Sequence, residues 1–333
     1  MIVILKNRAD ADELDNLVYW LKEQGIGVRP TVGAQQTILG LVGDTSRIDM
    51  DLIAALDIVE SVKRVQEPFK YVNRKFHPED TVIPVGNVQI GGGGVTIFAG
   101  PNAVESEEML METAEAVLAG GAGILSGGAF KSRSSPYAFQ GLGIEGLRLL
   151  MKAKEKTGLP VMSEIMDGSQ LPAFENVDIL EVGPGNMNNY ALLRALGRCP
   201  KPVLLRRNPS ATYEEFLMSA EYIVSGGNNQ VILCECGVRT FENYTRATLD
   251  LAAVPVLKSL THLPVVVDPG HACGKYALVP SLAAAAVAAG ADGVCLDVHN
   301  DPAHARCGGP QSLTTDRFMR VAEELRSVAE AVR

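Results

Sequence analysis

The chain has 333 residues, of which 47% are hydrophobic, and a formal net charge of −9. An acidic chain without a basic run is a poor match for nucleic acid, and no apolar stretch is long enough to cross a bilayer. Lys6 follows only a few apolar residues, which argues against a signal peptide. Six cysteines in a chain of this length do not make a disulfide framework, so we expect a cytoplasmic protein.

Residues 1–66 predict a small ferredoxin-like domain of βαββαβ order. The expected strands and helices are Ile2–Leu5, Asp10–Gln24, Gly27–Val32, Thr37–Val42, Ile48–Leu56 and Val59–Val65. In the first helix the leucines recur on one face, as an amphipathic helix requires. Residues 67–94 are polar and contain prolines, which favours a linker that ends in a hairpin closing the floor of the next domain. The run Gly91–Gly94 is expected to be the turn of this hairpin.

Residues 95–333 alternate eight times between short apolar strands and helical sequence, which predicts a (β/α)8 TIM barrel. The expected strands are Val95–Pro101, Gly123–Ala129, Pro160–Glu164, Ile179–Gly183, Pro202–Arg207, Gln230–Glu235, Pro264–Asp268 and Gly293–His299. Helices are expected at Glu107–Leu118, Tyr213–Val224 and Asp316–Val332, among others. Polar residues gather at the carboxyl ends of the strands, where barrel enzymes build their active sites.

Cationic and hydroxyl side chains cluster just past the second barrel strand. Lys131 and Arg133 are followed by the Ser134–Ser135 pair in a segment framed by glycines. Guanidinium and ammonium groups suit phosphate oxygens, so this cluster predicts an anion site rather than a solvated loop. Arg206 and Arg207 end the fifth strand, where side chains alternate. One of the two should therefore enter the barrel mouth and the other should pack among the helices.

Histidine and carboxylate side chains end the seventh and eighth strands. Asp268 precedes His271, and Asp297 precedes His299. Such groups bind divalent metals or move protons, and a hydrogen-bonded structural pair is the alternative. Three cysteines also lie at or beyond strand ends: Cys236, Cys273 and Cys307. Their spacing is not that of a CxxC metal site, so packing of small side chains is the simpler interpretation.

Several long motifs resemble one enzyme family, the 3-deoxy-D-arabino-heptulosonate 7-phosphate (DAHP) synthases. They include Gly127-Gly128-Ala129-Phe130-Lys131, Ser134-Ser135-Pro136-Tyr137, Phe139-Gln140-Gly141-Leu142-Gly143, Asp268-Pro269-Gly270-His271 and Arg239-Thr240-Phe241-Glu242. The resemblance spans the chain and is to the subfamily related to 3-deoxy-manno-octulosonate 8-phosphate synthase, with a ferredoxin-like domain in front. It implies a tetramer that condenses phosphoenolpyruvate with erythrose 4-phosphate using a divalent metal. The front domain of such enzymes often senses aromatic amino acids.

The resemblance assigns roles to some residues and removes others. Lys131 matches the catalytic lysine, and Arg133 with Ser134 matches the grip on the aldose phosphate. His271 matches a metal ligand, and Asp297 stands where the family has a glutamate ligand. Asn102 replaces a cysteine ligand and Gly308 replaces an aspartate ligand, so half of the implied metal sphere is missing. Asparagine also occurs at the cysteine position in metal-independent relatives, where it is compatible with catalysis.

The positions that bind phosphoenolpyruvate in the family differ more. Ser126, Gly185 and Cys236 stand in place of arginines, and Arg206 takes the place of a lysine. Charge-assisted hydrogen bonds contribute roughly 1.5–3 kcal/mol each, so this loss predicts much weaker binding of phosphoenolpyruvate. We therefore expect a diverged enzyme with carbon–carbon bond-forming or lyase-type chemistry on an anionic sugar phosphate or a compound related to the shikimate pathway. The alternatives are an authentic DAHP synthase and a catalytically silent regulatory paralogue.

The expected site follows from these assignments. The catalytic candidates are Lys131, His271, Asp297, Asn102 and Glu164. The substrate-binding candidates are Arg133, Ser134, Ser135, Arg206, Ser126, Cys236 and Asp268. We expect no bound cofactor; the alternative is a manganese, zinc or iron ion held weakly by His271 and Asp297 at an incomplete site. The expected partners are a small anionic substrate, a second copy or three further copies of the chain, and a small effector at the N-terminal domain.

Overall fold

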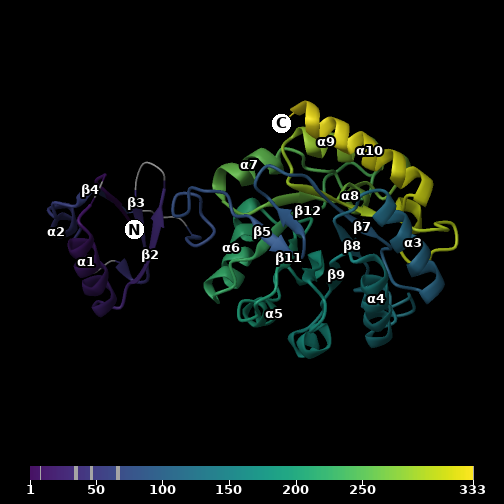
Figure 1. Cartoon of the computed structure of the whole chain (residues 1–333), viewed down its shortest axis with the longest axis horizontal. Coiled ribbons are helices and arrows are strands. Elements are labelled where there is room, and N and C mark those ends of the chain that lie inside the picture. Colours follow the sequence, from purple (N-terminus) through teal and green to yellow (C-terminus); the bar gives the residue numbers. More distant parts are fainter. Residues whose placement is uncertain (8, 34–36, 46–47, 65–67, 333) are drawn as a thin grey trace. The chain divides into compact units, whose positions relative to one another are not determined.

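The computed structural model describes residues 1–7, 9–33, 37–45, 48–64 and 68–332 (Figure 1). Two compact units make up the chain, one of residues 1–79 with 260–262 and one of residues 80–259 with 263–333. The expected domain boundary at residues 66 and 67, and the expected end of a strand at Val65, lie outside the described residues.

The N-terminal unit contains a four-stranded antiparallel sheet with two helices. The strands are β1 (Ile2–Leu5), β2 (Gly27–Val32), β3 (Thr37–Val42) and β4 (Val59–Lys63), in the order β2-β3-β1-β4. The helices are α1 (Ala11–Glu23) and α2 (Met50–Ala54). Asp10 caps the start of α1 by accepting hydrogen bonds from the backbone N–H groups of Asp12 and Glu13. Leu17 and Leu21 form the buried face of this helix. The ferredoxin-like arrangement is confirmed.

The second unit is a closed barrel of eight parallel strands, which confirms the predicted TIM barrel. Its strands are β7 (Thr96–Gly100), β8 (Ile124–Ser126), β9 (Val161–Glu164), β10 (Ile179–Val182), β11 (Val203–Arg206), β12 (Val231–Glu235), β13 (Val265–Val267) and β14 (Gly293–Asp297). The ring closes where β14 pairs with β7, so the first and last strands of the barrel are neighbours. Most strand residues are buried, because core side chains fill the inside and helices cover the outside.

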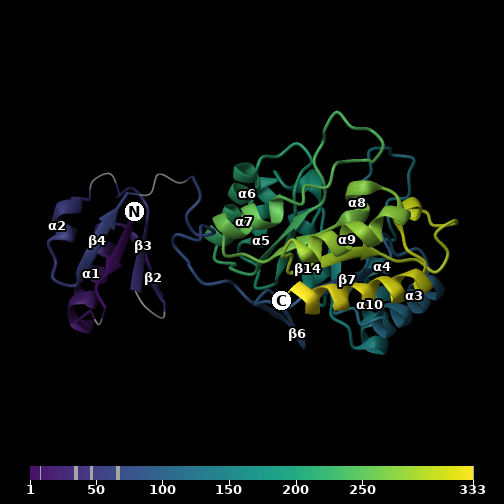
Figure 2. The same cartoon turned by 90° about the horizontal axis from the view of Figure 1, so that it is seen from above.

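Helices surround the barrel in both views (Figures 1 and 2). They are α3 (Glu107–Ala119), α4 (Ile144–Thr157), α5 (Tyr190–Leu196), α6 (Tyr213–Ser225), α7 (Ala253–Leu260), α8 (Pro269–Cys273), α9 (Val279–Ala288) and α10 (Thr315–Val332). A capping box at Thr212 and Glu215 begins α6, which satisfies backbone donors at its first turn. Between β9 and β10 the connection is a 3-10 helix, Gly168–Phe174, with Pro172 inside it.

A hairpin does precede the barrel, but its turn is not the glycine run. Strands β5 (Ile83–Val85) and β6 (Val88–Ile90) pair so that Val85 faces Val88, which leaves Gly86 and Asn87 as the turn. Gly86 has a φ of +58°, a left-handed conformation that suits glycine in a tight turn. Gly91–Gly94 instead join β6 to β7. Ile83, Val85 and Ile90 pack with barrel residues such as Phe98, as a floor would.

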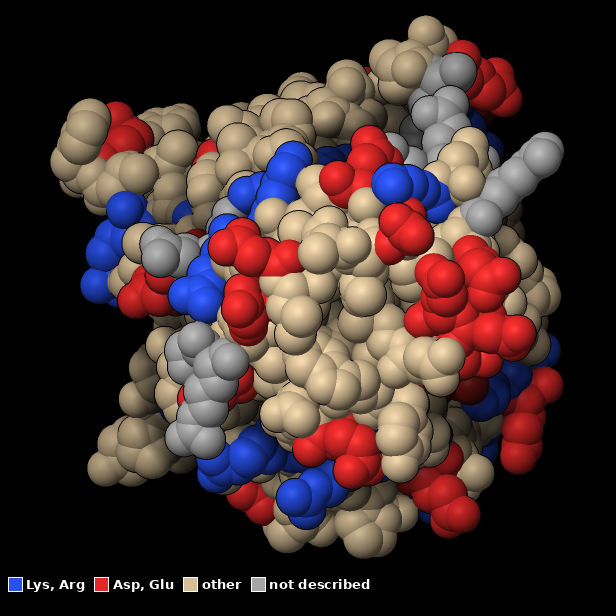
Figure 3. Space-filling view, turned by 90° about the vertical axis from the view of Figure 1, so that its left-hand side faces the viewer, with Lys and Arg blue, Asp and Glu red and all other residues tan. Residues whose placement is uncertain are grey.

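No helix in the described part of the chain is both long and apolar enough to cross a membrane. On the face of the molecule in Figure 3, acidic side chains lie among lysines and arginines, so charges of both signs are mixed there.

Candidate active site

A cavity of about 340 Å³ lies at the carboxyl ends of the barrel strands, lined by the last residues of some strands and by the loops that follow. Six of the predicted site residues line it: Asn102, Lys131, Arg133, Glu164, Arg206 and His271. Two more, Asp268 and Asp297, bind these residues directly. Segments far apart in the sequence are brought together because every parallel strand of a barrel ends at the same rim.

Lys131 is held in the cavity by an ion pair of its side chain with a carboxylate and by a hydrogen bond of its backbone N–H. Its Nζ lies 3.1 Å from Glu164 Oε2, and its backbone N–H donates to Gln140 O at 2.9 Å. The stem of Lys131 runs so close to Gly128 that a Cβ built there would lie 2.4 Å from Lys131 Cδ and 2.6 Å from Asn102 O. Glycine is therefore required at position 128. Burial alone would lower the pKa of Lys131, but the carboxylates of Glu164 and Glu181 raise it, so the ammonium persists at neutral pH.

Arg206 enters the barrel mouth and is neutralised there. Its Nε donates to Glu181 Oε1 at 2.5 Å, and its NH1 donates to Asp268 Oδ2. The adjacent Arg207 points to the other side, where it pairs with Glu235 and lies over the Tyr213 ring. Their opposite directions follow the alternation of side chains along a strand, as expected. Burial opposes the charge of Arg206, but the two carboxylates outweigh it and raise the pKa of this guanidinium.

Asn102 bridges the two groups that the sequence suggested as metal ligands. Its Nδ2 lies 3.0 Å from His271 Nε2 and donates to Asp297 Oδ2 at 2.9 Å. An amide nitrogen can only donate, so this contact belongs to neutral His271, with the proton on Nδ1 facing Asp268 Oδ2 at 2.8 Å. Burial lowers the pKa of His271, but Asp268 and Asp297 together raise it. The two carboxylates therefore favour the protonated form of His271.

These residues do not fit the divalent metal that the resemblance implies. Asn102 Nδ2 occupies the space between His271 and Asp297, and Gly308 has no side chain to offer. A Cβ built on Gly308 would lie 2.7 Å from Asn102 Cβ, so the loop has closed against Asn102 where an aspartate would need room. Among the described residues, no three His, Cys, Asp or Glu side chains are grouped to hold a metal. Transition-metal sites usually need three or four such ligands.

Four predicted substrate-binding residues lie elsewhere. Ser126 ends β8 without lining the cavity, and Ser134 and Ser135 are exposed. The hydroxyl of Ser135 accepts a hydrogen bond from Tyr137 N, which makes a local turn. Cys236 is buried, and its Sγ donates to Arg207 O at 3.1 Å. The thiol of Cys307, in contrast, does line the cavity and contacts Asn102 Oδ1 at 2.8 Å.

The residues that line the cavity without having been selected from the sequence include Glu181, Arg246 and Gln311. Glu181 had a signal, because it is a charge inside the apolar strand β10. Arg246 lies in a loop and Gln311 ends a 3-10 helix of only three residues, Gly309–Gln311, so no periodicity indicates where either side chain points. Gln311 Nε2 donates to Asp297 Oδ2 at 2.5 Å, while its Oε1 is buried without a hydrogen-bond partner in the described structure.

The barrel and the lysine, carboxylate and histidine groups at its rim define an enzyme of the aldolase type. Comparison with known proteins gives the family. Residues 69–333 match the DAHP synthetase I family, and residues 1–67 match the DAHP synthase ferredoxin-like domain. The chain belongs to the DAHP synthase family.

Individual relatives agree with this assignment. The chain is 45% identical over 333 residues to phospho-2-dehydro-3-deoxyheptonate aldolase of Thermotoga maritima, covering 100% of this chain and 98% of that protein. A crystal structure of the DAHP synthase from the same organism superimposes with a TM-score of 0.79 at 44% identity, covering 99% of this chain and 97% of the other. A 2-dehydro-3-deoxyphosphooctonate aldolase of Trichlorobacter lovleyi is 31% identical, covering 75% of this chain and 98% of its own length.

The expected divergence away from phosphoenolpyruvate is wrong. Identity of 45% along the whole chain to a DAHP synthase supports the alternative, an authentic enzyme of that kind. The error came from counting substituted positions one at a time. The cavity retains four cationic side chains, of which Arg246 was not considered: Lys131, Arg133, Arg206 and Arg246. The loss at Ser126, Gly185 and Cys236 therefore does not leave the cavity without cations.

Proposed function

We propose that this protein is a DAHP synthase that condenses phosphoenolpyruvate with erythrose 4-phosphate. The similarity along both domains supports this proposal, as does the cavity in which Lys131 stands beside three guanidinium groups. In the reaction, the methylene carbon of phosphoenolpyruvate forms a bond to the aldehyde carbon of the aldose. Water adds to the neighbouring carbon, the phosphate leaves, and the aldehyde oxygen gains a proton.

The side chains of the cavity supply what these steps require. The Lys131 ammonium, kept charged by Glu164 and Glu181, stabilises the negative charge that develops on the aldehyde oxygen. His271 exchanges a proton, with Asp268 holding its ring in one tautomer. Arg133 holds the phosphate of the aldose. Asn102 lies beside His271 and Asp297, where its amide orients the attacking water.

The test is product formation from the two substrates. Purified protein is incubated with phosphoenolpyruvate and erythrose 4-phosphate, and released phosphate and the 3-deoxy-2-keto acid are measured together. We expect both to appear in equal amounts. Release of phosphate without the keto acid would refute the proposal, and so would the absence of turnover whichever substrate is added first.

We further propose that the reaction needs no resident divalent ion. The support is the Asn102 amide between His271 and Asp297 together with the contact of Asn102 with Gly308. Elemental analysis of the purified chain should find less than one transition metal per chain, and turnover should survive prolonged treatment with a chelator. Loss of turnover with the chelator, restored by manganese or zinc, would contradict this.

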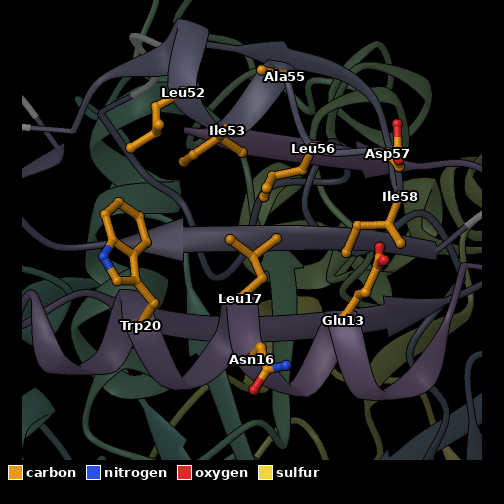
Figure 4. Close-up of a pocket in the computed structure, with 10 residues that line it drawn as sticks. All are labelled: Glu13, Asn16, Leu17, Trp20, Leu52, Ile53, Ala55, Leu56, Asp57 and Ile58. Atoms are coloured by element: carbon orange, nitrogen blue, oxygen red, sulfur yellow. The ribbon is translucent and has the colours of Figure 1, made fainter.

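We propose cytoplasmic localisation, a homodimer or homotetramer, and a small effector that binds the N-terminal domain. A cavity of about 590 Å³ on that domain supports the effector, because Leu17 and Trp20 of α1 lie opposite Leu52 and Ile53 of α2 (Figure 4). Glu13 and Asp57 also line it, so a ligand with an apolar body and an ammonium group would fit its chemistry. The effector is tested by the thermal shift of the full chain with each aromatic amino acid, and the oligomeric state by light scattering, which measures the mass of the assembly.

A further inference from the structure

Arg246 lies at the mouth of the catalytic cavity, in the loop between β12 and α7. Its NH1 lies 3.5 Å from the carbonyl oxygen of His271, and its backbone N–H donates to Cys273 O at 3.3 Å. Its side chain runs over Gly274, where an added Cβ would lie 3.3 Å from Arg246 Cβ and NH2. The loop and the start of α8 thus hold this exposed guanidinium at the rim of the cavity.

The charges in the cavity separate its four cations into two kinds. Lys131 is paired with Glu164, and Arg206 is paired with both Glu181 and Asp268. Within the described part of the chain, Arg133 and Arg246 form no ion pair with a carboxylate. Arg133 instead contacts Cys307 Sγ. The two guanidiniums available to an incoming anion are therefore Arg133 and Arg246.

Two substrates with separate anionic groups must be held in this one cavity. The family resemblance assigns Arg133 to the aldose phosphate. The other cations on the phosphoenolpyruvate side, Arg206 and Lys131, are already paired with carboxylates, so Arg246 is the cavity cation that, within the described part of the chain, remains without one. Gly185 lines the same cavity with open space in front of it, because a Cβ built there would meet only Ser132 Oγ, at 4.0 Å. Gly185 has no side chain with which to bind an anion.

We propose that Arg246 is the residue that binds the anionic end of phosphoenolpyruvate. This inference rests on the proposed function, since it names the partner of one of its two substrates. A guanidinium offers two parallel N–H donors that match a phosphate or carboxylate. Because Arg246 is exposed, the folded protein bears no cost of burying its charge, and the guanidinium loses water only when it pairs with the anion.

The experiment measures binding of phosphoenolpyruvate to the full-length protein by calorimetry, without the aldose. Arg246→Ala should raise the dissociation constant at least about tenfold, the effect of losing one charge-assisted pair at a partly solvated site. Arg246→Lys should raise the dissociation constant less than Arg246→Ala does, because lysine keeps the positive charge but lacks the two parallel N–H donors. The matched control is Arg239→Ala, an exposed arginine of the same loop that does not line the cavity, and it should bind as the wild type does.

Steady-state kinetics add a second readout. Arg246→Ala should raise KM for phosphoenolpyruvate while leaving KM for erythrose 4-phosphate within about twofold. Equal binding of phosphoenolpyruvate by wild type and Arg246→Ala would overturn the assignment, and so would a rise in KM for the aldose phosphate alone. Binding that depends on Arg246 with no product formed would keep the assignment and refute the proposed function. If the wild-type chain does not bind phosphoenolpyruvate, both fail.

Discussion

Replacing Gly308 by alanine should destabilise the protein more than its backbone conformation alone explains. Gly308 has a φ of +72°, and a residue with a side chain in that left-handed region costs about 1–2 kcal/mol relative to glycine. The new Cβ would also lie 2.7 Å from Asn102 Cβ and 2.8 Å from Asn102 Cγ. Such overpacking typically costs about 1–3 kcal/mol, so Gly308→Ala should lower the free energy of unfolding by about 2–5 kcal/mol in total.

Gly158 provides a matched control for this variant. It has the same φ of +72°, at the end of α4, and nothing lies within 4 Å of a Cβ built on it. Gly158→Ala should therefore cost only the backbone strain, about 1–2 kcal/mol. Denaturant unfolding of both variants measures the difference. If the two lose equal stability, the close contact between Gly308 and Asn102 does not exist as described.

A double-mutant cycle locates the cause. In an Asn102→Gly background the atoms that meet the new Cβ are absent, so Gly308→Ala should then cost no more than Gly158→Ala does. Gly308→Ala should also reduce turnover, because it pushes the Asn102 amide away from His271 and Asp297. An unchanged rate would mean that the amide has no part in catalysis.

Three further variants test the site. Lys131→Met should lower kcat by about 100-fold or more, as removal of one preorganised charge does, and a loss below tenfold would exclude its proposed role. Arg133→Ala should weaken binding of the aldose phosphate by about 2 kcal/mol, roughly 30-fold in KM, with stability nearly unchanged; full activity would make this grip a relic. Asp268→Asn should lower the free energy of unfolding by about 3 kcal/mol, because it removes the carboxylate partner of His271 Nδ1 and leaves Arg206 with Glu181 alone; denaturant unfolding with a loss under 1 kcal/mol would contradict this.

Much of the architecture could be predicted from local sequence. Each barrel strand is a short apolar run such as Val231–Glu235, and a strand buried on both faces requires that pattern wherever it lies. The position of Lys131 was also predictable, since it follows a strand end within a glycine-rich segment. The ends of strands were less predictable: β8 stops at Ser126, three residues before the expected Ala129.

The hairpin illustrates the limit of local reasoning. Both Gly86 and the run Gly91–Gly94 allow a turn, and only the pairing of β5 with β6 decides between them. Glu181 could have been found from the sequence, since a charge in an apolar strand needs a partner. Its partner Arg206 is 25 residues away, on the neighbouring strand.

Only the closed barrel decides which residues meet in the cavity. Asn102 follows β7, the first strand, while Asp297 ends β14, the last, and their contact joins residues 195 positions apart. Gly308 lies against Asn102 for the same reason: a Cβ built on Gly308 would lie 2.7 Å from Asn102 Cβ. The amino-acid sequence by itself determined the strands, the helices and the family motifs, because these depend on local periodicity and residue type. Which side chains neutralise one another, and which remain available to a substrate, depends on ring closure, and ring closure is a property of the whole barrel.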